Sequence, residues 1–248
     1  MARDKSLNGL KVLITRPHEQ AQKLYNEIND AGGEALLFPV IEIVTIPYEQ
    51  WAEHDLAKQD MIIFISRNAV SNFVRELKAE IPQNNQLVAI GRGTANSMQG
   101  HGLRVDIQPT QSSGSHALLT MLGRVNVTGK NILIVRGKGG RELLADSLGA
   151  RGAKINYIEA YQRRLATPSA SQYEQALKAD CIVCTSVMGV DNVSILLKNE
   201  ITSLLAIPIV VVSERIQQHA LSLGFERVIV TSKVSDNAIV HQLMEMEK

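Results

Sequence analysis

Runs of hydrophobic residues alternate along the chain with stretches of helical periodicity. In the first hundred residues, continuous Val, Ile, Leu and Phe runs predict strands at 11–15, 35–40, 61–65 and 87–90. Amphipathic stretches between and after them predict helices near 18–31, 68–79 and 94–101. Runs without polar alternation are typical of parallel strands that helices cover on both faces. The pattern therefore predicts a doubly wound α/β fold with parallel sheets.

The same pattern occurs twice. "NGLKVLITRP" at 8–17 matches "TGKNILIVRG" at 128–137, and "DMIIFISRNAV" at 60–70 matches "DCIVCTSVMGV" at 180–190, both at an offset of 120 residues. A third pair, "LVAIGRGTANSMQGHGL" at 87–103 and "IVVVSERIQQHALSLGF" at 209–225, is offset by 122. Three matches in the same order indicate an internal duplication, and hence two similar domains.

Composition is consistent with two α/β domains and gives no sign of a polymeric partner. The 248 residues are 45% hydrophobic, enough for two cores. The net charge is +1, from 26 basic and 25 acidic residues, so no global field attracts nucleic acid or an anionic membrane. The first residues, "MARDKSLNGLKVLITRP", resemble neither a signal peptide nor a membrane span. We therefore expect a cytoplasmic protein.

A glycine-rich turn, "RGKGGRE" at 136–142, lies between a predicted strand and a predicted helix. Such a turn is a common anion site, and Arg136, Lys138 and Arg141 add positive charge with no nearby acid but Glu142. Glu142 stands where the dinucleotide fingerprint needs its third glycine, and no Gly-Lys-Ser/Thr follows. The turn is therefore predicted to bind an anion other than a nucleotide.

The sequence lacks the residue patterns expected for thiol redox, metal-binding and hydrolytic sites. Cys181 and Cys184 form a C-x-x-C motif, but they lie in an apolar strand-like run, which predicts buried thiols rather than a redox pair. The six histidines show no close ligand spacing, so no metal is expected. Neither a Ser/His/Asp order nor a pair of carboxylates suited to hydrolysis is apparent.

The turns predicted at the carboxyl ends of the strands, where ligands bind in such sheets, share hydroxyl and basic side chains. Ser66 and Ser186 are predicted helix N-caps, and capping alone would explain both. The basic side chains would converge with helix N-termini on a ligand rich in negative charge, although each alone could be an ordinary surface charge. They are Arg16, Arg67, Arg92, Arg136, Lys138, Arg141 and Arg215.

Six motifs, in order over nearly the whole chain, resemble the uroporphyrinogen-III synthase family. They are "LITRP" at 13–17, "FISRNAV" at 64–70, "AIGRGTA" at 89–95, "YIEAYQRR" at 157–164, "TSVMGV" at 185–190 and "VSDNAIVHQLM" at 234–244. The resemblance implies a lyase that cyclises hydroxymethylbilane, a linear tetrapyrrole with eight carboxylates, to uroporphyrinogen III in haem and sirohaem biosynthesis. Water is lost and the last pyrrole ring is inverted, with no cofactor.

The resemblance also implies individual site residues. Tyr161 matches the family's active-site tyrosine and would protonate the departing hydroxyl, with packing at the interdomain connection as the alternative. Thr94 matches a threonine that would donate a hydrogen bond to a carboxylate. In the second copy this position falls near Arg215, which departs from the family pattern. The expected substrate-binding residues are Arg16, Ser66, Arg67, Asn68, Thr94, Arg136, Lys138, Arg141, Ser186 and Ser213.

Domain boundaries do not follow from the duplication alone, since a cut between the copies would fall near residue 125. The family implies a crossed arrangement of flavodoxin-like topology. One domain would comprise 1–40 and 163–248, the other 45–158, and segments 41–44 and 159–162 would form a two-stranded hinge that permits closure.

The resemblance implies few partners beyond the small-molecule substrate. We expect a monomer without nucleic-acid or membrane binding, in transient contact with hydroxymethylbilane synthase. The alternative function is a non-enzymatic two-lobed binding protein for a polycarboxylate ligand. The lack of a recognisable signal peptide counts against a periplasmic role of that kind.

Overall fold

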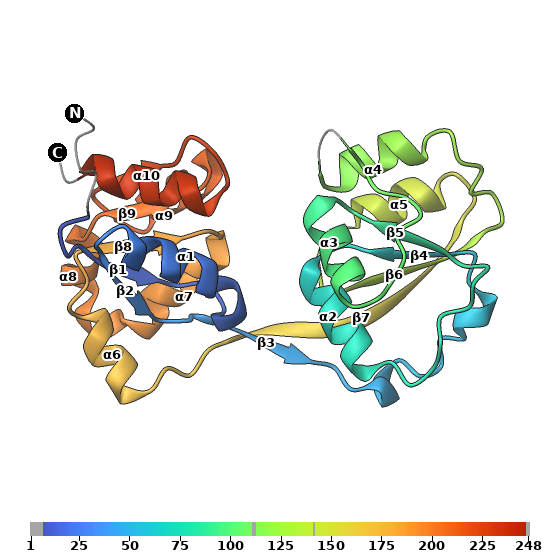
Figure 1. Ribbon diagram of the computed structural model, residues 1–248, viewed down its shortest axis with the longest axis horizontal. Helices are drawn as coiled ribbons and strands as arrows, with labels where there is room; N and C mark the ends of the chain where they lie inside the picture. The colour runs from blue at the N-terminus through green and yellow to red at the C-terminus, as the bar shows by residue number, and fades with distance from the viewer. Residues whose placement is uncertain (1–6, 111–112, 141, 247–248) are drawn as a thin grey trace. The chain divides into compact units, whose positions relative to one another are not determined.

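The computed structural model describes residues 7–110, 113–140 and 142–246, and the chain divides into two compact units (Figure 1). Unit 1 comprises Met1–Glu42 and Arg164–Lys248, and unit 2 comprises Ile43–Arg163. The chain thus begins in unit 1, forms unit 2 as one continuous insertion and returns to complete unit 1.

Unit 1 contains a five-stranded sheet in the order β10-β9-β8-β1-β2. Its strands are β1 (Lys11–Ile14), β2 (Glu34–Leu37), β8 (Cys181–Cys184), β9 (Ile209–Val211) and β10 (Val228–Val230), and they pair in parallel. Its helices are α1 (His18–Asp30), α6 (Ala170–Ala176), α7 (Val187–Leu196), α8 (Ile201–Ala206), α9 (Glu214–Ser222) and α10 (Asp236–Met246), with a short 3₁₀ turn at Lys198–Glu200. Helix α1 packs against α10, and α7 packs against α9.

Unit 2 contains a second five-stranded sheet in the order β3-β7-β6-β4-β5. The strands are β3 (Ile41–Thr45), β4 (Met61–Phe64), β5 (Gln86–Ala89), β6 (Asn131–Gly137) and β7 (Lys154–Leu165). The helices are α2 (Arg67–Glu76), α3 (Arg92–Gly100), α4 (Ser115–Leu122) and α5 (Leu143–Gly149), and short 3₁₀ turns lie at Tyr48–Gln50 and Leu56–Lys58.

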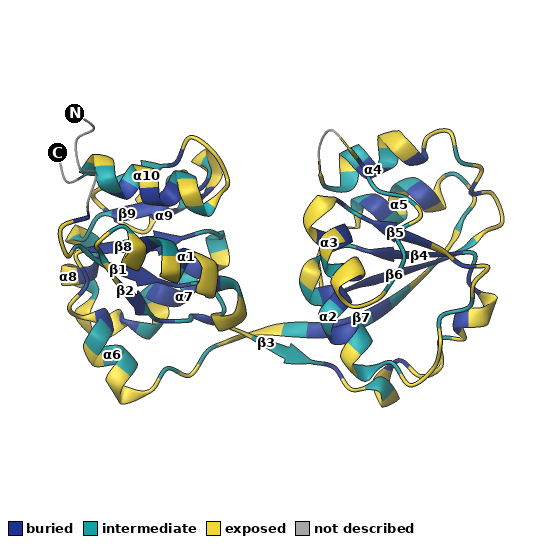
Figure 2. Ribbon diagram, viewed as in Figure 1, coloured by how far each residue is buried: buried dark blue, intermediate teal, exposed yellow. Residues whose placement is uncertain are grey.

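The sheet of unit 2 separates two hydrophobic cores. On one side Phe64 and Ile62 pack with Val70 and Phe73 of α2 and Met98 of α3. On the other side, strand residues pack with Leu118 and Leu122 of α4 and Leu144 and Leu148 of α5. Figure 2 shows the resulting layers in both units, with buried central strands and exposed outer helix surfaces. The predicted doubly wound fold is confirmed.

The two sheets share a strand order because each unit takes half of each sequence copy. Strands β9-β8-β1-β2 of unit 1 correspond, through the offsets of 120 to 122 residues, to β5-β4-β6-β7 of unit 2. Numbered along the chain within each unit, and read from β5 in unit 2 and from β2 in unit 1, these four strands follow in both units the flavodoxin-like order 2-1-3-4, which unit 1 completes with β10. A cut near residue 125 would separate the paired strands β4 and β6, so the copies are not the structural units.

Two equivalent carboxylates fix this crossed arrangement at the starts of the strands. In unit 1, an oxygen of Asp180 accepts a hydrogen bond from the backbone N–H of Lys11 at 2.9 Å. In unit 2, Asp60 accepts from the backbone N–H of Asn131 at 2.8 Å. Both the acids and their partners are 120 residues apart, so each bond joins one copy to the other.

Strands β3 and β7 are neighbours, and the division between the units falls within both of them. The N–H of Ile46 donates to the Ala160 carbonyl at 3.0 Å, and the N–H of Ala166 donates to the Val40 carbonyl at 3.2 Å. From Val40 to Ile46 the residue numbers rise, while those of their partners fall from Ala166 to Ala160, so the two strands run antiparallel. They contain the segments 41–44 and 159–162 of the predicted ladder.

The cysteines of β8 are free and buried, as the apolar run predicts. Burial raises the pKa of both thiols to about 12, and the hydroxyl of Thr15, 3.3 Å from Sγ of Cys184, offsets little of that effect. We expect neither thiol to react with iodoacetamide at pH 8 in the folded protein, because the reactive thiolate is scarce and shielded. Both should be alkylated in denaturant, as intact-mass measurement would reveal; rapid alkylation of the folded protein would contradict this.

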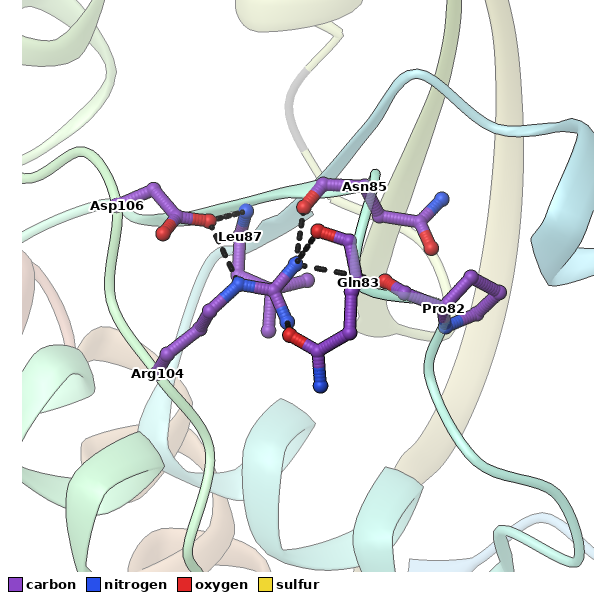
Figure 3. A network of polar contacts seen from close by, with 6 residues as sticks. All are labelled: Pro82, Gln83, Asn85, Leu87, Arg104 and Asp106. Atoms are coloured by element: carbon purple, nitrogen blue, oxygen red, sulfur yellow. Dashed lines mark hydrogen bonds and ion pairs between the residues drawn. The ribbon is translucent and has the colours of Figure 1, made fainter.

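Arg104 holds the loop before β5 to the segment that follows α3 (Figure 3). Its guanidinium donates to the carbonyl of Gln83 at 3.1 Å, to that of Asn85 and, through Nε, to Asp106 at 3.2 Å. Asp106 also accepts from the N–H of Leu87 in β5 at 2.7 Å. One side chain therefore connects the loop, the strand and the returning chain.

Replacing Arg104 with Ala is expected to lower the free energy of unfolding by about 1–2 kcal/mol, because several acceptors lose their shared donor at a half-buried site. Activity per folded molecule should stay unchanged, since Arg104 lies near the amino end of β5. Urea unfolding measures the first effect. Arg104→Lys is the control. It should recover only part of the stability, because an ammonium group cannot reproduce the several hydrogen bonds of the planar guanidinium.

Candidate functional site

The carboxyl edge of the unit 2 sheet gathers many of the predicted site residues. Ser66 follows β4 and caps α2, its oxygen accepting from the N–H of Ala69 at 3.0 Å. Arg67 is exposed at the first position of that helix. Thr94 is buried in the first turn of α3, after β5, and Arg92 is exposed there. Parallel strands end at the same edge, so these turns are neighbours.

Asn68 and Lys138 are two further predicted residues in this unit. Asn68 lies in the first turn of α2, and its backbone carbonyl accepts from the side chain of Asn72 at 2.8 Å. Lys138 is exposed directly after β6, and its backbone N–H donates to the Tyr161 carbonyl at 2.7 Å. Arg141 lies outside the described residues.

Tyr161 reaches the turn before α2 because β7 carries a bulge. Glu159 pairs with Arg136 and Tyr161 with Gly137, so Ala160 is an extra residue on β7. Strict alternation would place Tyr161 on the side of Glu159. The bulge instead lets its ring join the core that contains Ile158, Ala160 and helix α2, beneath the cap of that helix.

The hydroxyl of Tyr161 is held by two polar side chains, although the residue as a whole is only 1% exposed. Nη2 of Arg163 donates to it at 2.8 Å, and Oγ of Ser66 lies 3.2 Å away. The Arg163 guanidinium also lies 5.1 Å from the ring centroid. Gly137 permits the position of the ring, because a Cβ atom on residue 137 would lie 2.6 Å from Cζ of Tyr161.

A count of protons shows what the Ser66–Tyr161 pair can do. The two hydroxyls have two protons, and the bond between them uses one. Arg163 and the N–H of Ala69 are donors, so neither accepts the other proton. Whichever hydroxyl donates within the pair, one O–H therefore remains to donate to a third group. The arrangement is suited to delivering a hydrogen bond or a proton to a ligand.

The glycine-rich turn differs from its prediction. Arg136 is only 4% exposed, and its Nη1 donates to Glu142 at 2.8 Å while its Nε donates to the Gly139 carbonyl at 3.1 Å. The expectation of a single nearby acid is wrong, because Glu159 also reaches the turn and accepts from the N–H of Gly139 at 3.1 Å. Strand β7 supplies this second acid, which the local sequence of the turn does not reveal.

Glu142 also accepts a hydrogen bond from the phenol of Tyr157, and the three groups form a compact cluster. The hydrogen bonds from Tyr157 and then Arg136 lower the pKa of the Glu142 carboxyl. Burial, followed by the bond to Glu142, raises the pKa of Tyr157 to about 12. The carboxyl is therefore ionised and the phenol neutral near pH 7, and both states favour their bond.

Unit 1 has an equivalent edge with fewer exposed charges. Ser186 caps α7, as predicted, and accepts from the N–H of Gly189 at 3.0 Å. Arg16 follows β1 and forms an ion pair with Asp236 at 2.5 Å, so this arginine has an acid partner. Ser213 precedes α9 without a side-chain capping bond, and Arg215 is exposed in the first turn of that helix.

The site also contains three residues that the sequence did not predict: Arg163, Tyr157 and Glu159. All three lie in "YIEAYQRR", and the spacing of two between Tyr157 and Glu159 is a signal for a shared strand face. Nothing in the sequence reports the bulge that separates Tyr161 from that face. Among the described residues, no cluster of three or more His, Cys, Asp or Glu side chains could hold a metal ion.

The fold and the edge residues define a class: two-unit, flavodoxin-like α/β proteins with hydroxyl and basic side chains at the carboxyl ends of the strands. Residues 22–241 match the family described as Uroporphyrinogen-III synthase HemD. The uroporphyrinogen-III synthases of Escherichia coli (strain K12) and Salmonella typhimurium (strain LT2) are 29% and 30% identical to this chain. Each alignment covers 94% of this chain and 100% of the relative.

A solved structure supports the same fold. The uroporphyrinogen-III synthetase of Helicobacter pylori 26695 aligns with a TM-score of 0.68 and 17% sequence identity, over 96% of this chain and 99% of that one. The chain belongs to the uroporphyrinogen-III synthase family, and its function lies in tetrapyrrole biosynthesis. Across the described parts of the chain, no helix has the length and apolar character that crossing a membrane requires.

Proposed function

We propose that this protein is a lyase that converts hydroxymethylbilane to uroporphyrinogen III. In this reaction the hydroxymethyl carbon of the first ring loses water, and the resulting azafulvene cation attacks the substituted carbon of the last ring. A spiro intermediate then fragments and recloses with that ring inverted. The observation that carries the proposal is the family match over residues 22–241, which includes Tyr161 and its polar partners.

Tyr161 is the proposed proton donor to the departing hydroxyl. A phenol is a weak acid, so the proton must be directed at the leaving oxygen to be useful. Arg163 donates to the Tyr161 oxygen at 2.8 Å, so this contact fixes the oxygen and does not use the phenol proton. Ser66 can return a hydrogen bond to that oxygen from 3.2 Å. The geometry therefore supports a donor whose hydroxyl is held in place by two side chains.

The remaining polar residues are proposed to hold substrate carboxylates. In unit 2 these are Ser66, Arg67, Asn68, Thr94, Arg136, Lys138 and Arg141, and in unit 1 they are Arg16, Ser186 and Ser213. Exposed cations at helix starts, such as Arg67, are the strongest support, because the helix dipole and the guanidinium attract an anion together. Holding a flexible tetrapyrrole in one folded conformation would account for much of the rate enhancement.

The enzyme would act as a cytoplasmic monomer, without a cofactor, and would receive its unstable substrate through transient contact with hydroxymethylbilane synthase.

Product analysis tests the proposal directly. The protein is incubated with freshly prepared hydroxymethylbilane, the products are oxidised, and the uroporphyrin isomers are separated by chromatography. Without enzyme the substrate closes to the unrotated type I isomer, so type III should dominate only when the protein is present. A product ratio equal to the spontaneous one would favour a non-enzymatic polycarboxylate-binding protein instead.

A further inference from the structure

The turn after β6 contains a two-donor carboxylate site that the chain fills with its own Glu142. One carboxylate oxygen accepts from Nη1 of Arg136 at 2.8 Å, and the other accepts from the phenol of Tyr157. The Arg136 guanidinium lies 4.7 Å from the centroid of the Tyr157 ring, so the two donors are packed together. We call Arg136 and Tyr157 the donor pair.

The two donors lie in strands of the sheet, whereas Glu142 lies in the turn before α5. Arg136 lies in β6 and Tyr157 in β7, at parallel-paired strands, and the Arg136 side chain is only 5% exposed. The Glu142 side chain is 50% exposed and precedes the short helix α5. A buried guanidinium without an anion is unfavourable, so a carboxylate that displaced Glu142 would keep the Arg136 charge paired.

We propose that a carboxylate of the tetrapyrrole substrate replaces Glu142 at the donor pair, so that Glu142 occupies a substrate subsite in the free protein. The inference rests on the proposed function. The exchange preserves the charge and both hydrogen bonds, and it leaves the released Glu142 free to be solvated.

The location favours this exchange. Gly137 follows Arg136 directly and contacts the ring of Tyr161, and the backbone N–H of Lys138 donates to the Tyr161 carbonyl. A carboxylate on the donor pair would therefore bind at the same carboxyl edge as the proposed proton donor, although Tyr157 packs on the α5 side of the sheet and Tyr161 on the α2 side. The exposed ammonium-bearing side chain of Lys138 adds attraction for a polyanion at the same turn.

Glu142→Gln separates a displaced occupant from a permanent structural partner. Gln keeps the shape but competes poorly for a guanidinium, so the KM for hydroxymethylbilane should fall by about fivefold, the order expected for a half-exposed ion pair. Binding of uroporphyrin III, the stable oxidised form of the product, should tighten by a similar factor in a fluorescence titration. If Glu142 were a permanent partner that positions Arg136, the KM for hydroxymethylbilane and the Kd for uroporphyrin III would both rise instead.

Glu159→Gln is the matched control, because it removes the same charge from the same turn without touching the donor pair. An equal fall in KM for both variants would indicate long-range electrostatics and overturn the proposal. Tyr157→Phe removes a donor that serves Glu142 and the substrate carboxylate alike, so it should change the KM less than Glu142→Gln does. If Glu142→Gln folds poorly, Glu142→Asp serves instead, since its shorter carboxylate cannot reach both donors and should also lower the KM; an unchanged or raised KM would count against the subsite.

The outcome is distinguishable from a failure of the proposed function. If the unsubstituted protein yields only type I product, the assigned reaction is wrong, whatever Glu142 does. If it yields type III product and Glu142→Gln raises the KM, the reaction stands and the subsite is wrong.

Discussion

Tyr161→Phe is expected to slow turnover by about 10- to 100-fold, at and below the lower end of the range for a positioned proton donor. The phenylalanine ring fills the same buried space, so folding should be largely preserved, while Arg163 and Ser66 lose their shared partner. The product should remain the type III isomer, because substrate folding by the binding residues, rather than proton donation, selects the isomer.

Steady-state measurement of kcat, together with isomer analysis, checks this expectation. Tyr157→Phe is the control for loss of a phenol on the same strand, and its effect should fall on the KM more than on kcat. Turnover of Tyr161→Phe equal to that of the parent would assign Tyr161 to packing alone. Loss of type III selectivity would instead give the phenol a role in folding the substrate.

Gly137→Ala is expected to reduce turnover by about 100-fold, because displacing a catalytic group by roughly 1 Å has effects of that size. The new Cβ atom would lie 2.6 Å from Cζ and 2.8 Å from Cε2 of Tyr161, closer than such atoms can approach. The ring must therefore move, and its hydroxyl must leave the positions set by Ser66 and Arg163. Stability should also fall, by about 1–3 kcal/mol, as in other overpacked sites.

The double mutant of Gly137→Ala and Tyr161→Phe tests whether the loss of turnover in Gly137→Ala acts through Tyr161. In the Gly137→Ala background, Tyr161→Phe should slow turnover little further, because the hydroxyl is already misplaced. Full additivity of the two losses would show that Gly137 acts through something else. Gly149→Ala is the matched control, since a Cβ atom there meets nothing within 4 Å at the end of α5. Its activity should equal that of the parent.

Much of the fold could be predicted from the chain because its signals are local. The uninterrupted apolar runs gave β1, β4 and β5 within a residue of their observed ends. Strand β2 ends earlier than expected, at Leu37, because Pro39 offers no N–H to a sheet. The N-cap roles of Ser66 and Ser186 were also predictable, since a serine before a helix bonds only to its own first turn.

The candidate site was predictable in residue type and less so in contacts. Basic residues at strand ends were identified, but the acid partner of Arg16 and the second acid at the glycine-rich turn, Glu159, were not. Arg16 pairs with Asp236, 220 positions away, and Gly139 bonds with Glu159 from the neighbouring strand. Such partners come together only through strand pairing and helix packing, which local patterns do not encode.

By itself the sequence determined the duplication, the parallel α/β class and the buried character of Cys181 and Cys184, because each depends on which residues recur or on how continuous an apolar run is. Only the tertiary structure decided that β4 pairs with β6 across the two copies, and that the bulge at Ala160 brings Tyr161 to Ser66. It also decided that Glu142 fills the donor pair. These features depend on the register of strands distant in the chain, and a shift of one residue would turn each side chain to the other face.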